Sequence, residues 1–425
     1  MVTMTIRAIF VVVALTVYHV RYVTGSDEVT EPPAVCPVTR EPGIRTFDIR
    51  LTEAEVPRRK TYYVCQQFTV PSDEVYHAVA FEPIIANKDV MHHMILFACG
   101  DDVTAGDPHL CGAEDLKCET WLTVWTVGLE GQICTHHNTG AKFGRGSMRH
   151  MSLQIHWNNP DLRGDYVDSS GMRIYYTPRL RKYDLGNVQF GQNYLAIPPL
   201  SRDYEQHGGC TPYCTKKRLP HPIYLTRTYL HMHHLATAGA MEQYRNGKLI
   251  RVIALDPEYQ YVTPPIHVHD PAVEILPGDE VLVRCWYNTL DGDRRRYNTT
   301  LFGLGTDAEM CYAFVSYFPA VPRFDQCAQF QSLETGECAR KTGRIGECNV
   351  ASFLNLVSST LSNEILANCH LSEVCHAQCY LPLQELFNHV CMKGPLAMYF
   401  TQNQLMSVPA WPRIVNIYNH ARTKC

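Results

Sequence analysis

Many of the twenty histidines in this chain of 425 residues stand in short clusters. The clusters are His92-His93, His136-His137, His150 with His156, His231-Met232-His233-His234 and His267-Val268-His269. Imidazole is the commonest metal ligand among the side chains. On a β-strand, residues i and i+2 lie on one face, so His231 and His233 direct two imidazoles to a common point. The pattern indicates a metal centre with nitrogen ligands.

Spacing alone leaves the number of metal sites open. His267 and His269 have the same spacing as His231 and His233, so the residues by themselves permit one or two sites. Adjacent His92 and His93 cannot share a face of a regular strand. If both bind one ion, the strand needs a bulge, or the two rings must use different nitrogens.

The elements that must position these residues are predicted to be short strands. Alternating segments cover 152–158, 172–177, 248–255 and 273–289, with turn clusters between them, which predicts an all-β chain of two antiparallel, jelly-roll-like sandwiches. A proline- and glycine-rich stretch, 196–209, suits a join between the two. From about residue 350 the spacing becomes helix-like. We therefore predict domains at 36–200 and 201–340, and a cystine-tied tail at 341–425.

Charge and cysteine content restrict the partners and the compartment. The 38 basic and 42 acidic residues form no long run, so neither nucleic acid nor an anionic membrane is expected as the main partner. Residues 1–25 have the layout of a secretory signal that is cut near Gly25. The alternative is a membrane anchor, but the apolar run is shorter than the roughly 20 residues of a span. No other stretch is apolar enough.

Eighteen cysteines, an even number, suit an oxidising compartment in which they pair as disulfides. The zinc-type spacing C-x₂-C does not occur. A glycosylation sequon begins at Asn298. Together these features predict a protein that is secreted or lies in the lumen of secretory vesicles, with no stable membrane span after the signal is cut.

Five motifs resemble the copper- and ascorbate-dependent monooxygenases, a family that includes the dopamine and tyramine β-monooxygenases and the peptidylglycine α-hydroxylating enzyme. They are HHMILFAC (92–99), LQIHWNNP (153–160), DSSGMRIYYT (168–177), LHMHHLATAG (230–239) and EMCYAFVSYFP (309–319). The likeness runs from about residue 36 to 330, with a looser echo in the tail. The block at 168–186 is more similar to the dopamine and tyramine branch, whose extra N-terminal domain this chain is expected to be too short to include.

The resemblance implies two coppers, with ascorbate as electron donor and O2 as co-substrate. One copper would be held by His92, His93 and His156, and the other by His231, His233 and Met310, the two facing each other across solvent from different sandwiches. A thioether favours Cu(I), the state that meets dioxygen. The alternative for Met310 is core filler. The remaining clustered histidines match no copper ligand, and we interpret them as surface or supporting residues: His136, His137, His234, His267 and His269.

The resemblance also implies disulfides. The implied pairs are Cys65–Cys111, Cys99–Cys118, Cys210–Cys327 and Cys285–Cys311, and Cys214 is expected to reach into the tail, with Cys391 as the suggested partner. The sequence assigns no partner to the other eight: Cys36, Cys134, Cys338, Cys348, Cys369, Cys375, Cys379 and Cys425. An oligomer formed through the tail, disulfide-linked or non-covalent, is a further expectation.

Substrate residues follow from where this chain departs from its relatives. The peptidylglycine enzyme binds a carboxylate with an arginine, an asparagine and a tyrosine at positions that are Tyr229, Tyr312 and Phe314 here. An aromatic wall without charge does not clamp a carboxylate, but it offers a cation–π surface to an amine. Gln189 stands where the dopamine enzyme has a glutamate. We predict a small phenylethylamine such as tyramine or dopamine. A non-catalytic copper-binding or disulfide scaffold, and a peptidylglycine-type hydroxylase, are the alternatives.

Overall fold

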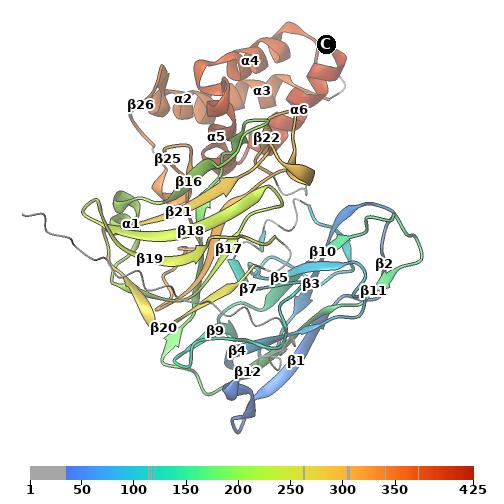
Figure 1. Cartoon of the computed structure of the whole chain (residues 1–425). Helices are drawn as coiled ribbons and strands as arrows, with labels where there is room; N and C mark the ends of the chain where they lie inside the picture. The colour runs from blue at the N-terminus through green and yellow to red at the C-terminus, as the bar shows by residue number, and fades with distance from the viewer. Residues whose placement is uncertain are drawn as a thin grey trace, which may run out of the picture. The chain divides into compact units, whose positions relative to one another are not determined.

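The computed structural model describes residues 35–425 except 113–114, 116, 119, 262–263, 304–306, 340, 372 and the side chains of 402, 403 and 407. The predicted signal segment, 1–25, lies outside this range. Most described elements up to residue 334 are strands of antiparallel sheets, so the predicted all-β class is confirmed (Figure 1). None of the described helices is long and apolar enough to cross a membrane.

The first sandwich consists of two main sheets around one apolar core. One sheet has the order β1-β12-β4-β9-β13, with β8 paired to β4, and the other has the order β6-β3-β10-β5-β7. Their bounds are β1 (Arg45–Arg50), β12 (Gly171–Thr177), β4 (Val75–Ile84), β9 (Thr139–Gly144), β13 (Tyr183–Asp184), β8 (Ile133–Cys134), β6 (His109–Leu110), β3 (Thr61–Thr69), β10 (His150–Asn158), β5 (Met91–Ala98) and β7 (Thr120–Thr126); β2 (Ala54–Glu55) pairs with β11 (Val167–Asp168).

The alternation of β10 shows how this sandwich positions a histidine. Met151, Leu153 and Ile155 are fully buried in the core. Because successive side chains on a strand point to opposite faces, the even-numbered residues of β10, among them Gln154 and His156, lie on the other face of the sheet. That face therefore carries the polar side chains of the strand.

The second sandwich repeats the arrangement with its own core. One sheet has the order β20-β17-β23-β14-β24-β25 and the other β16-β21-β18-β19. Their bounds are β20 (Ile266–Ile275), β17 (Ile223–His231), β23 (Cys311–Phe318), β14 (Gly186–Gln192), β24 (Gln326–Phe330), β25 (Leu333–Glu334), β16 (Tyr204–Cys210), β21 (Glu280–Tyr287), β18 (Ala236–Arg245) and β19 (Lys248–Asp256); β15 (Ala196–Ile197) pairs with β22 (Thr300–Leu301), and α1 (Pro212–Arg218) follows β16.

The change from one sandwich to the other falls earlier in the chain than the predicted boundary at residue 200. β13, which ends at Asp184, pairs with β9 of the first sandwich. β14, which begins at Gly186, pairs with β23 and β24 of the second. Val188 and Phe190 of β14 are buried in the second core, so this strand belongs to the second sandwich. The proline-rich stretch at 196–209 lies inside the second sandwich.

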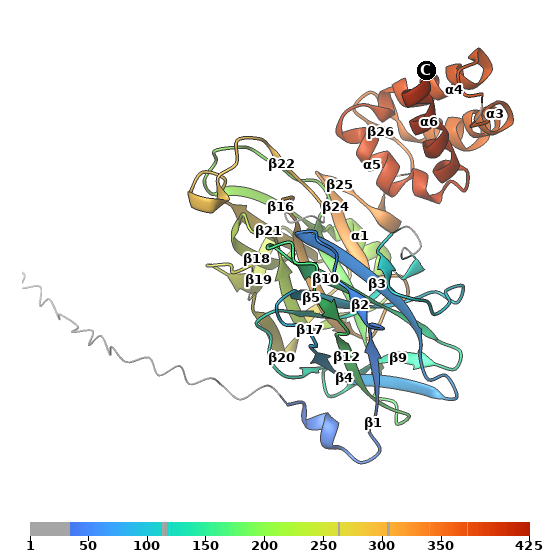
Figure 2. The ribbon, with the colours of Figure 1, turned by 90° about the vertical axis from the view of Figure 1, so that its right-hand side faces the viewer.

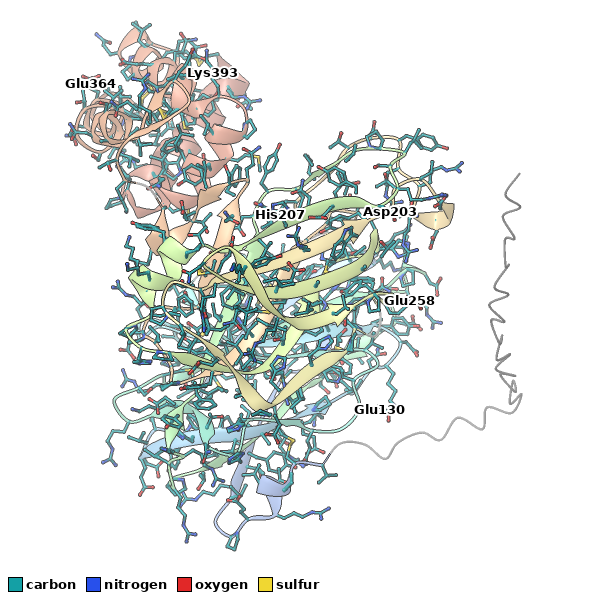
Figure 3. The ribbon with its side chains drawn as sticks, turned by 60° about the vertical axis from the view of Figure 1, so that its left-hand side comes forward. Glu130, Asp203, His207, Glu258, Glu364 and Lys393 are labelled. Carbon is teal, nitrogen blue, oxygen red and sulfur yellow. A yellow bond between two sulfur atoms is a disulfide. The ribbon has the colours of Figure 1, made fainter. Side chains whose placement is uncertain are left out.

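The tail has a helical core of its own. Its elements are β26 (Arg344–Ile345), β27 (Cys348–Asn349), α2 (Val350–Asn355), a π-helical turn (Leu356–Leu361), α3 (Ser362–Asn368), α4 (Ala377–Asn388), α5 (Pro395–Asn403) and α6 (Trp411–Lys424). Figure 2 shows these helices gathered together, and Figure 3 shows Glu364 and Lys393 on their outer surface. The apolar sides of the helices enclose buried residues such as Phe353 and Trp411.

All eighteen cysteines lie in the described part of the chain and pair within it. The four pairs that the resemblance implies are present. Six of the unassigned cysteines pair with one another, as Cys36–Cys134, Cys369–Cys379 and Cys375–Cys425. The other two, Cys338 and Cys348, pair with Cys214 and Cys391, respectively. An oligomer formed through the tail, disulfide-linked or non-covalent, stays a prediction.

The prediction that Cys214 pairs with Cys391 was wrong. Cys338 follows β25 in a 3-10 turn that contacts α1, the helix that carries Cys214. Cys391 is instead fully buried in the core of the tail, where it bonds to Cys348. Cys214 therefore pairs with a cysteine close to the second sandwich, and Cys391 pairs with a cysteine of the tail.

Candidate metal centre

A β-bulge brings the adjacent histidines of β5 to one site. β10 pairs with β5 as His156 opposite His93 and then Trp157 opposite Met91, which leaves His92 as an extra residue. Met91 and Met94 both face the core as a result, although three positions separate them. The bulge also lets His92 and His93 approach, with their Nδ1 atoms 3.1 Å apart. One of the two arrangements that the sequence permitted is therefore present.

The three histidines of the first sandwich fit a metal ion. One ring nitrogen from each of His92, His93 and His156 lies within 4.8 Å of the others. Both ring nitrogens of His156 are buried and have no hydrogen-bond partner among the described residues. A buried polar atom without a partner is costly unless a ligand satisfies it. The donor set, three imidazoles, suits copper.

Burial keeps these imidazoles neutral, as a metal ligand must be. Burial, together with the smaller effect of neighbouring histidines, lowers the pKa of His92 to about 4 and that of His156 to about 3. Burial also lowers the pKa of His93, with His156 as the next cause. Tyr63 of β3 stacks on His156, with ring centroids 4.4 Å apart, and holds that ring in place.

The second group of ligands lies at the end of β17 and the start of β23. His231 is the last residue of β17, and the rings of His231 and His233 lie 5.4 Å apart. His233 Nδ1 lies 2.9 Å from the carbonyl oxygen of Ala308, so we assign the proton to Nδ1 and the lone pair to Nε2. Burial also keeps the pKa of His231 well below its ordinary value.

Glu309 positions both ends of this second group. Its two carboxyl oxygens accept hydrogen bonds from the backbone N–H groups of His233, Leu235 and Met310, at 2.8, 2.6 and 3.2 Å. Burial raises the pKa of Glu309 to about 8, and the three backbone donors oppose that rise. One buried side chain thus joins the loop after His231 to Met310, the residue just before β23. Sequence reasoning missed this residue, although it directly precedes Met310.

Met310 lies between two fixed points. Tyr287 donates a hydrogen bond to its carbonyl oxygen at 2.6 Å, and the next residue, Cys311, forms the disulfide with Cys285. Its side chain is 7% exposed, yet it lines a cavity with His231 and His233 and is not part of the core of the second sandwich. This placement favours a ligand over core filler.

The two groups of histidines contact each other in this structure. The ring centroids of His93 and His231 lie 6.5 Å apart, and Tyr261 lies between His92 and His233 with centroid distances of 5.1 and 5.8 Å. The prediction of two sites that face each other across solvent is therefore wrong for this arrangement. Tyr261 had no sequence signal, because its loop contains no recognisable motif.

The predicted substrate residues surround the ligands on one face. In β23, Tyr312 and Phe314 alternate with core residues, and Gln189 of β14 pairs opposite Phe314. All three line a cavity of about 470 Å³ together with Met310, and Trp121 of β7 closes one wall. Tyr229 stacks beside His231, with ring centroids 5.9 Å apart, but lines a neighbouring cavity instead.

The other histidines have separate contacts. His267 Nε2 lies 2.7 Å from a carboxylate oxygen of Asp256, and His269 Nε2 lies 2.9 Å from Thr228 Oγ1. His234 pairs with Asp293 at 3.0 Å. These three belong to neither group of candidate ligands, and their supporting role stays a prediction. His136 and His137 lie at the neighbouring cavity with their rings tilted and the ring centroids 4.1 Å apart.

Two antiparallel sandwiches, one with a group of three histidines and the other with two histidines and a methionine, define a class of two-site copper proteins. His93 of the first group and all three residues of the second line one cavity. Residues 47–164 match the N-terminal domain, and residues 183–337 the C-terminal domain, of the copper type II ascorbate-dependent monooxygenases. The chain belongs to this family.

Curated relatives agree with this assignment. Over 306 residues the chain is 29% identical to human DBH-like monooxygenase protein 1, a match that covers 68% of this chain and 49% of that protein. It is 31% identical over 290 residues to bovine dopamine beta-hydroxylase (65% and 47%) and 32% identical over 279 residues to tyramine beta-hydroxylase of Caenorhabditis briggsae (62% and 47%). The chain spans about half the length of the curated relatives it matches.

Proposed function

We propose that the protein is a secreted or vesicular two-copper monooxygenase that hydroxylates an unactivated C–H bond with O2 and ascorbate. The proposed substrate is a phenylethylamine such as tyramine or dopamine, attacked at its β-carbon. The observation that carries the proposal is that His93 of the first ligand group and all three residues of the second group line one aromatic-walled cavity. Nine disulfides support an oxidising compartment.

The residues of the chain divide the work between two sites. Bound copper would supply one-electron transfer at the three-histidine site and dioxygen chemistry at the site with the thioether. His92, His93 and His156 are neutral and pre-positioned, so little reorganisation is needed to hold a metal. Glu309 and the Cys285–Cys311 disulfide fix the approach of Met310 from opposite ends. These contacts fit the requirement that a site hold its ligands on rigid elements.

The cavity supports an aromatic substrate. Its volume of about 470 Å³ is ample for a single aromatic ring with a short chain. Tyr312 and Phe314 provide π-faces for the ring or the ammonium group, and no carboxylate is among the described residues that line it. Gln189 offers an amide for a hydroxyl or an ammonium. An amine would thus be held by aromatic faces rather than by an ion pair.

The test is oxygen uptake by the copper-loaded protein with ascorbate, measured with tyramine, dopamine and glycine-extended peptides, together with identification of the hydroxylated product. We expect turnover with an amine, loss of turnover in His231→Ala, and retained turnover in the matched variant His267→Ala. Turnover only with the peptides would replace the amine by a peptidylglycine-type substrate.

The alternative from another class is a non-catalytic copper-binding or disulfide scaffold. It predicts that copper binds at both sites while no amine and no peptide causes ascorbate-dependent oxygen uptake. The intact ligand set favours the enzyme, because a scaffold has no need for a buried thioether beside two imidazoles.

A further inference from the structure

A second cavity adjoins the one at the metal ligands. Its volume is about 380 Å³, and Trp121 and Phe314 line both cavities, with their rings edge to face at 5.3 Å. Its other walls come from β7 and residues 132–137 of the first sandwich and from β17, β20 and β23 of the second. None of the residues predicted to bind copper is among the described residues that line it.

A largely buried arginine provides the only cationic side chain among the described residues of this cavity. A bulge in β17 between Leu225 and Arg227 places Arg227 on the same strand face as Tyr229 and His231. Burial lowers the pKa of Arg227 to about 10, so the guanidinium is still charged at neutral pH.

Arg227 has no counter-ion within the described part of the chain. Its Nη2 donates one hydrogen bond, 2.6 Å long, to the carbonyl oxygen of Cys134, and no described carboxylate lies within ion-pair distance. A guanidinium has five N–H donors. A charge that is largely removed from water is costly unless it is paired. The cavity therefore contains an uncompensated cation with donors to spare.

The remaining polar groups add hydrogen bonds rather than charge. Burial lowers the pKa of His136, and it lowers that of His269 to about 4, so both rings are neutral at pH 7. Asp270 is the only carboxylate among the described lining residues, and it is exposed to solvent on β20. One buried positive charge, opposed by a carboxylate outside, suits a singly charged anion and disfavours a dianion. Apolar residues such as Phe81 and Leu185 complete the wall.

We propose that this cavity binds an organic monoanion with a small apolar or planar body, its anionic oxygens on Arg227. Two molecules share that chemistry: an arylalkyl carboxylate, as part of a substrate, and ascorbate, whose ring carries an enolate. The second source rests on the proposed function, in which ascorbate is the electron donor. The proposal gives the unassigned pair His136 and His137 a place in a ligand site.

The experiment measures binding to the copper-free full chain by calorimetry, so that it does not depend on turnover. The probes are 3-phenylpropionate, its neutral amide, and ascorbate without oxygen. Arg227→Gln should weaken binding of the anions about 10- to 100-fold, the range for hydrogen bonds to a charged group, and leave the amide unchanged. Arg251→Gln, on the exposed face of β19, is the matched control and should change neither.

The pattern of binding identifies the source. Arg227-dependent binding of ascorbate alone assigns the cavity to the reductant, and such binding of the carboxylate alone assigns it to a substrate group. If Arg227→Gln weakens binding of the anions and of the neutral amide equally, the proposal is overturned. Arg227 would then only hold the cavity in shape, through its hydrogen bond to Cys134, and would not bind the anionic oxygens. Failure of both anions to bind would also overturn it, whatever the oxygen-uptake assay shows for the proposed function.

Two further variants keep the test decisive if Arg227→Gln does not fold. Val268 is 67% exposed and lines the cavity, so Val268→Trp should obstruct it and weaken anion binding, whereas Val252→Trp on β19 should not. Arg59 lines the cavity at the metal ligands. If Arg59→Gln abolishes anion binding and Val268→Trp does not, the anion lies at the other cavity and the proposal is wrong.

Discussion

Replacing Met310 by isoleucine separates its role as a copper ligand from its role in packing. The side chain is 7% exposed, and a swap between apolar side chains of similar volume typically costs less than about 1.5 kcal/mol. Folding should therefore survive. Mutation of a residue that only hydrogen-bonds to a metal ligand typically lowers metal affinity about 10- to 100-fold. Loss of the ligand itself should therefore lower the Cu(I) affinity at least about 10-fold, or about 1.4 kcal/mol. The two imidazoles would still hold Cu(II).

The assay combines Cu(I) competition with a chelator, copper counting and oxygen uptake with ascorbate. Met241→Ile is the matched control, because Met241 is fully buried in the core of the second sandwich. It should lose comparable stability and keep turnover. Met310→Ile should lose turnover while the three-histidine copper stays reducible by ascorbate; His93→Ala should instead interrupt electron delivery. Unchanged turnover and Cu(I) affinity in Met310→Ile would refute the ligand role.

Three other outcomes are expected. His267→Ala should leave two coppers per chain by metal analysis, because His267 contacts Asp256; loss of one ion would show that the other H-x-H pair binds metal. Replacing Cys285 and Cys311 together by serine should lower the free energy of unfolding, measured with denaturant, by about 2–5 kcal/mol and should weaken copper binding at the second site. An unchanged Cu(I) affinity would show that the disulfide does not position the ligands of that site. In the copper-free protein the pKa values of His92 and His156 are lower than in the unfolded chain, so the unfolded chain binds protons first as the pH falls. The free energy of unfolding should therefore decrease as the pH drops from about 6.5 through about 4 and 3, and each histidine contributes a slope of at most about 1.4 kcal/mol per pH unit. A free energy of unfolding that does not change with pH in urea titrations would contradict the burial of these two residues as neutral rings.

Local pattern was enough for the class of the fold and for the candidate ligands. Alternation in segments such as 152–158 predicts strands, and a strand forces residues two apart onto one face whatever its surroundings. For the same reason the sequence placed Tyr312 and Phe314 beside Met310. Four disulfides also followed, but through resemblance rather than through any property of the cysteines themselves.

Tertiary structure decided what depends on residues far apart in the chain. The bulge at His92 exists only because β10 pairs with both neighbours of that residue, and no property of the residues HHM alone selects it over the other arrangement. The partner of Cys214 depends on whether a 3-10 turn or the tail lies against α1. The approach of His93 to His231, and the uncompensated charge of Arg227, arise where two sandwiches meet. Spacing along a chain reports faces and periods, whereas distances between separate sheets are set by how their cores pack, and one sequence without its fold does not contain them.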